Sequence, residues 1–340
     1  MPPRTAVLIH PDFDPLYYGF YVEGLRRLFG RGSVRVGMRA FPGAAARSTG
    51  GKLTMRMVVE KDGATHRIAV EADDMLRYDP MTVEWAEHVG KVNYAASQVP
   101  AALAGRVIAL GPSFAIAAWR GVDVARWAAG ALVAPLPLAR RRQLAGNYLR
   151  QALLRVPIDA YRPRASEADY LFFAAKGWLR NAEVNPPRAI FMRVARSRPG
   201  LRFEGGFVPT SEGSPPELAP LMAPRPYKMA EYLERTARSV VAFNTPAVHD
   251  CLGWKLGEFL ALGKAIVSVP LKRELPEPLV HGKDIHFVDG DEDSMAAALD
   301  LLRRDHSYRQ HLERNARAYY DKLLAPEVVT RRLLVAAGVA

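Results

Sequence analysis

The segment from His249 to Pro270, with the sequence HDCLGWKLGEFLALGKAIVSVP, constrains the fold more than any other part of this chain. Leu256, Phe259 and Leu262 recur at helical spacing, so a helix is predicted to begin near Gly253. The start of such a helix carries free backbone N–H groups and the positive end of the helix dipole. The segment therefore predicts a place where a phosphate can bind.

The same segment ends in a predicted strand. Gly263 supplies a stop for the helix, and the apolar run 265–269 is typical of a short buried parallel strand ended by Pro270. Asp250 lies in the loop before the helix, and Glu258 projects from its second turn. We expect one carboxylate to meet a sugar hydroxyl and the other a ribose.

This pattern resembles the donor-binding segment of nucleotide-sugar-dependent glycosyltransferases of the GT-B type. Retaining members of that family carry Glu-x7-Glu and a helix of the form LEAMACGTPVV, and GEFLALGKAIV stands in its place here. Glu258 falls on the second glutamate, which in the family holds the nucleotide ribose, and Gly263 falls on the glycine before the strand. Asp250 falls on the first glutamate position, and this departure makes His249 an alternative polar contact for the donor sugar.

The resemblance covers about Tyr170 to the end of the chain and implies an α/β fold with two Rossmann-like domains facing across a cleft. Residues 1–160 are then the acceptor-binding domain and residues 161–340 the donor-binding domain, with the last helix packing back on the first. The proline-bounded segment 157–163 is the predicted linker. The implied activity is that of a hexosyl- or glycosyltransferase, which moves a sugar from a nucleotide sugar to a glycan hydroxyl.

Within the implied donor site, Lys255 extends toward the diphosphate and neutralises charge on the departing nucleotide. Lys176 and Arg180 lie in the loop that supplies basic residues to the diphosphate in the resembled family. Gly253 and Trp254 at the helix start and Thr245 in the preceding loop complete the candidate contacts. No metal or cofactor is expected.

The spacing of the two carboxylates favours retention because it resembles the retaining families. An inverting enzyme needs a base instead, and His10, Asp12 and Asp14, which follow the first predicted strand, are the candidates. Asp289-Gly290-Asp291 is the pattern with which single-domain glycosyltransferases hold a metal, but a turn and a helix cap also explain it.

Charge is concentrated in the first half of the chain. The first 165 residues hold 23 Lys and Arg against 13 Asp and Glu, whereas the remainder holds 24 against 22. Arg140, Arg141 and Arg142 follow the apolar run Trp127–Ala139, which is too short to span a bilayer. This pattern predicts contact with an anionic membrane surface and a lipid-linked acceptor, while a core helix with solvated arginines is the alternative.

Other features exclude several classes of protein. The chain has no zinc-finger, helix-turn-helix or RNA-recognition signature, so nucleic acid is not the expected partner. It lacks dinucleotide, Walker and zinc-hydrolase motifs.

A single cysteine, Cys251, and the absence of a secretory signal indicate a cytoplasmic protein, peripheral at the inner face of the cell membrane.

Two further predictions concern structure and function. Residues 55–60 and 66–71 alternate around Asp62-Gly63, which predicts a hairpin that decorates the first domain. A catalytically silent binder of sugar nucleotides or polysaccharide, and a GT-B-fold epimerase or phosphorylase, are the competing functions.

Overall fold

The structure is a computed structural model of the 340-residue chain that describes residues 5–42 and 54–339. Its contacts divide the chain into two compact units. Unit 1 comprises Met1–Ile158, Glu274–Pro276 and Leu323–Ala340, and unit 2 comprises Asp159–Arg273 and Glu277–Lys322.

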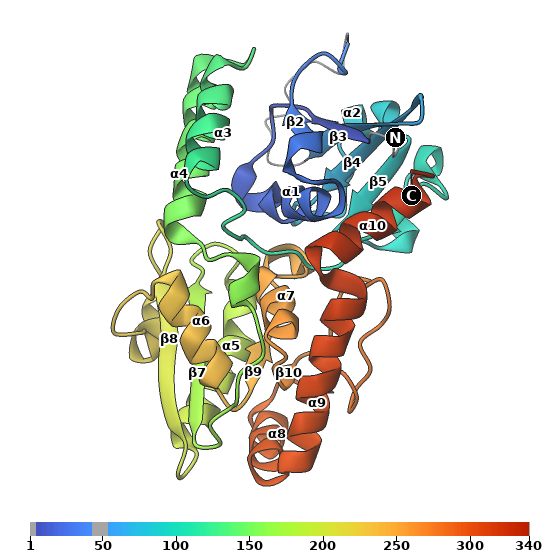
Figure 1. Ribbon diagram of the computed structural model, residues 1–340. Coiled ribbons are helices and arrows are strands. Elements are labelled where there is room, and N and C mark those ends of the chain that lie inside the picture. The colour runs from blue at the N-terminus through green and yellow to red at the C-terminus, as the bar shows by residue number, and fades with distance from the viewer. Residues whose placement is uncertain (1–4, 43–53, 340) are drawn as a thin grey trace. The chain divides into compact units, whose positions relative to one another are not determined.

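The described part of unit 1 contains a six-stranded sheet in the order β2-β1-β3-β4-β5-β6. The strands are β1 Ala6–Ile9, β2 Val34–Val36, β3 Met55–Lys61, β4 Ala64–Glu71, β5 His88–Lys91 and β6 Val107–Ala109. Helices α1 Pro15–Phe29, α2 Pro80–Trp85, α3 Val122–Val133, α4 Leu138–Leu154 and α10 Pro326–Ala336 belong to the same unit (Figure 1). β1 and β2 are parallel, as are β4, β5 and β6.

The predicted hairpin is confirmed, because β3 and β4 pair antiparallel around Asp62 and Gly63, both with positive φ. Its predicted place as a decoration is wrong. β3 also pairs antiparallel with β1, and β4 pairs parallel with β5, so the hairpin lies in the middle of the sheet. Five successive residues from Met55 to Val59 are buried, as expected of a strand covered on both faces.

Helix α10 returns to unit 1 and packs on α1. A Cβ atom at Gly24 of α1 would collide with the Pro326 carbonyl and the Thr330 side chain, so only glycine allows this close approach. The aromatic rings of Phe13, Trp119 and Tyr148 pack around Trp127 of α3, and Arg26 of α1 lies 4.9 Å from the centre of the Trp127 ring. Trp127 is therefore partly buried against these rings.

Unit 2 is also α/β. Strands β7 Tyr170–Gly177 and β8 Arg202–Pro209 pair in parallel, and β9 Ala242–Asn244, β10 Ile266–Ser268 and β11 His286–Phe287 form a parallel sheet in the order β11-β10-β9. The Val240 N–H donates to the Tyr170 carbonyl at 2.7 Å, so the residues just before β9 lie beside β7. The stacked rings of Phe191 and Phe243, 4.0 Å apart, lie in its hydrophobic core.

The helices of unit 2 are α5 Asn185–Ser197, α6 Met229–Arg238, α7 Trp254–Ala261, α8 Glu292–Arg304 and α9 His306–Tyr319. The predicted order of loop, short helix and strand is confirmed, since α7 has Gly253 as its N-cap and is followed by Gly263, with φ +61°, and β10. Asp291 caps α8 by accepting a 2.7 Å hydrogen bond from the Ser294 N–H. The α/β class of the chain is thus confirmed.

No helix within residues 5–42 and 54–339 is long and apolar enough to cross a membrane.

Candidate functional site

The carboxyl ends of β7 and β9 in unit 2 are joined by one buried arginine. Arg188, in the first turn of α5, is 8% exposed. Its Nε donates to Thr245 Oγ1 at 3.2 Å, directly after β9, and its guanidinium donates to the Lys176 carbonyl at 3.4 Å near the end of β7. Ligands of open α/β sheets bind at this edge, so Arg188 lies where a substrate is expected.

Arg188 forms no ion pair with any residue that the structure describes. Among the residues that the structure describes, no carboxylate lies within 4 Å of its side-chain nitrogen atoms. Burial lowers the pKa of its guanidinium to about 10, so the group keeps its charge at neutral pH. An unpaired buried cation is costly, and such groups occur where a ligand supplies the missing negative charge.

Lys255 is the second cation of this site and belongs to the first turn of α7. Its Nζ donates to the Tyr232 hydroxyl at 2.7 Å and lies 4.4 Å from the centre of the Tyr232 ring. Burial lowers the pKa of the ammonium to about 8, against an opposing effect of Glu258, and the positive charge of Arg188 lowers it further. The charge of Arg188 thus acts on the ammonium of Lys255.

Glu258 completes this group one turn later on α7 and is 5% exposed. A hydrogen bond with Tyr232 ties its carboxylate to the hydroxyl that also receives Lys255. Burial, with the negative charge of Glu258, raises the pKa of that phenol. Tyr232 therefore orients both charged side chains of α7.

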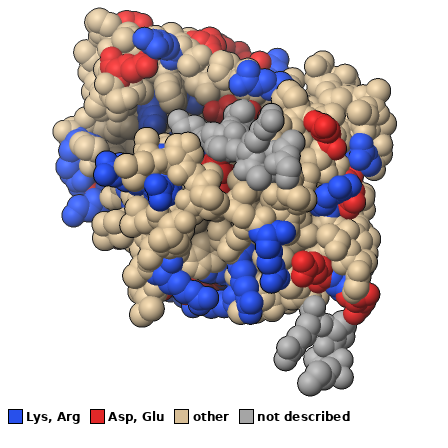
Figure 2. Space-filling model, turned by 90° about the horizontal axis from the view of Figure 1, so that it is seen from above, with Lys and Arg blue, Asp and Glu red and all other residues tan. Residues whose placement is uncertain are grey.

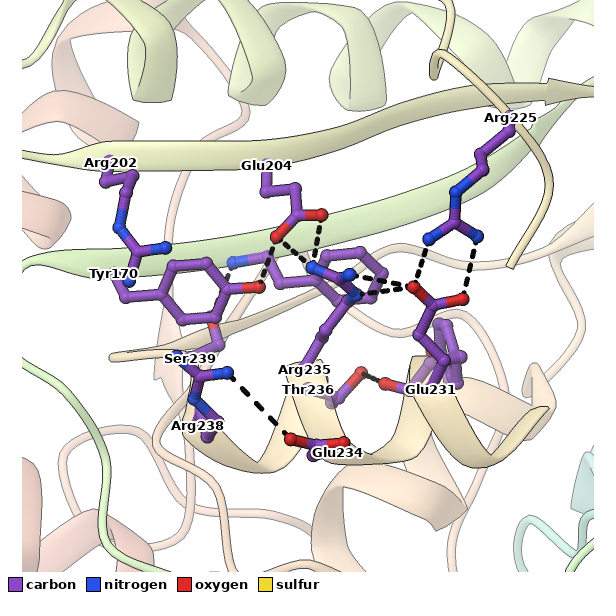
Figure 3. A network of polar contacts seen from close by, with 12 residues as sticks. Tyr170, Arg202, Glu204, Arg225, Glu231, Glu234, Arg235, Thr236, Arg238 and Ser239 are labelled. Carbon is purple, nitrogen blue, oxygen red and sulfur yellow. Dashed lines mark hydrogen bonds and ion pairs between the residues drawn. The ribbon is translucent and has the colours of Figure 1, made fainter. Parts of the chain in front are cut away.

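Helix α6, which carries Tyr232, is joined to β8 by a polar network (Figure 3). Arg235 of α6 contacts Glu204 of β8 and donates to Glu231 at 2.7 Å, while the Tyr170 hydroxyl donates to Glu204 at 2.8 Å. Arg225 also contacts Glu231, and these bonds lower the pKa of the Glu231 carboxyl to about 2. The network fixes α6 against the sheet, and α6 in turn places Tyr232.

The amino end of α7 contributes backbone donors. Gly253 is its N-cap, and no side chain of the described residues accepts a hydrogen bond there. His249 and Asp250 in the preceding loop have φ of 57° and 59°, a left-handed conformation that His and Asp adopt more readily than most residues. Both side chains are exposed, and Arg273 donates to the His249 carbonyl.

The remaining residues predicted for donor binding are more dispersed. Thr245 lies in the site and accepts the bond from Arg188. Trp254 is partly buried at the start of α7.

The two basic residues predicted from the loop after β7 are exposed. The ammonium of Lys176 lies 5.3 Å from the centre of the Trp178 ring. Arg180 is 82% exposed and pairs with Glu212 at 3.6 Å. The structure therefore brings Thr245 and Lys255 together with Arg188, and leaves Arg180 paired on the surface.

The three residues of unit 1 that were predicted as candidate bases all accept hydrogen bonds from other residues of the unit. Asp12 is buried and accepts from Arg140 at 2.6 Å, and His10 accepts from the Asp12 N–H at 3.1 Å. Asp14 caps α1 by accepting from Leu16 N–H at 2.9 Å. The base role stays a prediction for each of them.

Sequence reasoning missed Arg188 and Tyr232. The spacing of Arg188 with Phe191, Met192 and Ala195, all buried, places the arginine on the inner face of α5. An arginine at an apolar position of an amphipathic helix was the available signal for a buried charge. No comparable pattern identifies Tyr232, because its importance comes from its contact with α7.

No protein-family model and no curated protein matches this chain. Among solved structures, it is similar to Alr3699/HepE from Anabaena in complex with UDP and glucose, at 13% identity and a TM-score of 0.43, over 76% of this chain and 65% of that one. A glycosyltransferase from Rickettsia africae ESF-5 matches at 10% identity and a TM-score of 0.47, over 95% and 81%. MnaA of S. aureus with UDP matches at 13% identity and a TM-score of 0.37, over 74% and 69%. This chain thus spans just under two thirds of the length of the Anabaena protein.

Proposed function

We propose that this protein transfers a sugar from a nucleotide sugar to a hydroxyl group, with the nucleoside diphosphate as leaving group. The observation that carries the proposal is a pair of cations: Lys255, partly buried in the first turn of α7, and Arg188, buried in the first turn of α5, whose charge acts on Lys255. Two cations and the backbone N–H groups at the start of a helix suit a diphosphate better than a single phosphate or a neutral ligand. The resemblance of GEFLALGKAIV to a donor-binding helix supports the same ligand class.

The chemistry follows from charge. As the bond to the sugar breaks, negative charge grows on the oxygen that leaves with the diphosphate. Lys255 and Arg188 stabilise that charge more in the transition state than in the bound donor, which lowers the barrier. Because Lys255 is already oriented by Tyr232 at 2.7 Å, little reorganisation is needed during the reaction.

Glu258 is proposed to hold the ribose. A carboxylate accepts several hydrogen bonds, so its bond to Tyr232 leaves capacity for a sugar hydroxyl. Asp250 and His249 of the neighbouring loop are the proposed contacts to the donor sugar. Glu258→Gln keeps the shape of the side chain. It is expected to weaken the binding of the nucleotide-sugar donor and of the free nucleotide to a similar extent. Calorimetry showing unchanged nucleotide affinity in a folded variant would reject the ribose contact.

The donor domain, 161–340, and the acceptor domain, 1–160, remain the proposed division of labour, with a glycan hydroxyl as acceptor. A nucleotide-sugar epimerase, a phosphorylase and a silent binding protein also need a diphosphate or phosphate site. These proteins differ from a transferase in the products that they form, so an analysis of the products distinguishes the four functions.

The deciding experiment incubates the protein with a panel of nucleotide sugars without acceptor. A transferase slowly releases free sugar and nucleoside diphosphate, because water replaces the acceptor. Lys255→Met should abolish this release, while Lys283→Met, at an exposed lysine of the same unit, should not. An altered but intact nucleotide sugar would indicate an epimerase, sugar phosphate formed with added phosphate would indicate a phosphorylase, and binding without turnover would indicate a silent protein.

A further inference from the structure

Unit 1 contains a pocket of about 570 Å³ that the proposed transfer does not use. It lies where β1 and β2 end, with Pro11 after β1 and Gly37 after β2 in its wall, and α1 and α3 close its sides. The carboxyl ends of parallel strands are the usual ligand position in α/β units, and this volume is typical of small-molecule sites.

One part of the pocket wall is apolar. It is formed by side chains at and just after the end of β2 and by side chains of α3 and the turn after it, namely Val36, Met38, Trp127, Val133 and Pro135. Val133 is 80% exposed and Val36 38%. Apolar side chains left in water around an open pocket favour an apolar ligand.

The other part of the wall is cationic. Four arginines, Arg26, Arg31, Arg35 and Arg126, line the pocket against one carboxylate, Asp123. Asp123 lies 3.8 Å from Arg26 and 3.4 Å from Arg31, whereas Arg35 and Arg126 form no ion pair with any described residue. The pocket therefore has a surplus of positive charge that an anion would neutralise.

Arg26 adds a second observation. It is 6% exposed, its guanidinium lies 4.9 Å from the centre of the Trp127 ring, and it donates to the Ala118 carbonyl at 3.1 Å. Its Nε is buried and finds no hydrogen-bond acceptor among the described atoms. A buried donor without a partner is costly, so a ligand that brings an acceptor into the pocket recovers stability.

We propose that this pocket binds an amphiphilic anion, a phosphate head group that carries an apolar chain, as a lipid phosphate does. The head group lies against Arg35 and Arg126, and the first part of the chain lies along Val36, Met38 and Val133. None of these residues belongs to unit 2, so the proposal stands independently of the nucleotide site.

The surface around the pocket extends its apolar wall. Leu132 and Leu138, 46% and 51% exposed, lie in the same turn region as Val133. On the face seen in Figure 2, Lys and Arg side chains form groups beside uncharged surface. A chain longer than the pocket can continue over such a surface.

The test uses the full-length protein and decyl phosphate below its micellar concentration, measured by isothermal titration calorimetry. Inorganic phosphate presents the head group alone, and decyl maltoside presents the chain with a neutral head. We expect decyl phosphate to bind about tenfold or more tightly than either, because both halves of the wall contribute. Equal binding of inorganic phosphate or of decyl maltoside would overturn the proposal.

Variants locate the site. Two variants are expected to weaken the binding of decyl phosphate about tenfold or more. One combines Arg35→Ala with Arg126→Ala, and the other carries Val133→Asp alone. Leu153→Asp is the matched control, because Leu153 is 81% exposed on α4 and does not line the pocket. Equal weakening by Val133→Asp and Leu153→Asp would mean unspecific adsorption and reject the pocket. Binding of ADP, CDP, GDP and UDP should be unchanged in all these variants. A negative result for the lipid phosphate pocket would therefore leave the proposed transferase function untouched, and the reverse also holds.

Discussion

The ammonium of Lys255 and the hydroxyl of Tyr232 are 2.7 Å apart, and this bond joins α7 to α6. The same hydroxyl meets Glu258, so one phenol orients a cation and an anion that lie one turn apart. Lys255 and Glu258 come from the segment whose sequence is most informative, whereas Tyr232 lies more than twenty residues earlier. The chemistry of the site therefore depends on how α6 is fixed.

Tyr232→Phe tests this dependence. We expect the variant to lose about 1–3 kcal/mol of unfolding free energy, because buried Glu258 and partly buried Lys255 lose a shared partner. Nucleoside diphosphate affinity should also fall, since Lys255 is no longer held in place. Chemical denaturation and calorimetry give the two readouts.

Tyr227→Phe is the control for that prediction. The Tyr227 hydroxyl is buried and has no hydrogen-bond partner among the described atoms, so its removal should leave both quantities unchanged. If both variants lost stability and affinity alike, the loss would come from removing a buried hydroxyl in general and not from the bonds that Tyr232 makes to Lys255 and Glu258.

Arg188→Met separates binding from stability. Without its guanidinium, the site should bind nucleoside diphosphates about ten- to a hundredfold more weakly, as expected for a charged hydrogen-bond donor. The ligand-free protein should keep its stability or gain some, because a buried cation without a carboxylate partner is removed.

Arg193→Met is the matched change on the same helix. Arg193 is exposed and pairs with Glu292 at 3.5 Å, so neither affinity nor stability should move. A folded Arg188→Met protein that kept its nucleotide affinity would remove Arg188 from the site, and the anion site would then rest on Lys255 and α7.

The pKa of Lys255 predicts a pH dependence of binding. Burial depresses it to about 8, below the ordinary 10.5, so the ligand-free fold gains stability as pH rises from about 8 toward 10.5. A diphosphate favours the protonated ammonium and raises this pKa. Affinity should therefore be level below pH 8 and fall above it, by up to about tenfold per pH unit. Calorimetry at pH 9 in two buffers of different ionisation enthalpy should show proton uptake on binding.

Lys264 makes a specific control necessary. Its pKa is also lowered to about 8 by burial, but its ammonium is bonded to Ser166 and to the Ala237 carbonyl. Lys255→Arg keeps the charge of the site and does not titrate in this range, so its affinity should stay level through pH 9. A fall of the same size in Lys255→Arg would assign the titration to another group.

Much of unit 2 was predictable because its signals are local. Helical spacing in 254–262, the stop at Gly263 and the apolar run after it describe α7 and β10 almost as the structure has them. The hairpin of β3 and β4 was equally local, because Asp62-Gly63 specifies its turn. Its place in the middle of the sheet was not, since β3 pairs with a strand more than forty residues away.

The site was only partly predictable, because burial of a charged side chain depends on distant partners. Lys176, Arg180 and Arg188 are all basic residues near the end of β7, and only the structure shows Arg188 inside and Arg180 on the surface. Asp12 was considered as a base from its place after β1, and its bond to Arg140, 128 residues away, has no sequence signal.

The three consecutive arginines predicted to meet a membrane are not equivalent. Arg140 pairs with buried Asp12, and Arg141 donates to the Leu132 carbonyl at 3.0 Å, whereas Arg142 is exposed. Replacing Arg140 would remove a charged partner from buried Asp12 and destabilise the fold, so its effect could not be assigned to membrane binding alone. The informative pair is Arg126 and Arg142, both exposed on α3 and α4.

We expect the protein to sediment with anionic vesicles at low salt, because these exposed arginines lie on helices that also leave Leu132 and Val133 in water. Each basic residue near such a surface contributes about 1 kcal/mol, so replacing Arg126 and Arg142 by alanine should weaken binding about thirtyfold. Added salt should weaken it as well, since exposed charges are screened, and neutral vesicles should bind poorly. Arg314→Ala, an exposed arginine on α9 in unit 2, is the control and should have no effect. If the protein stayed in the supernatant with anionic vesicles at low salt, the apolar side chains of α3 and α4 would have another partner.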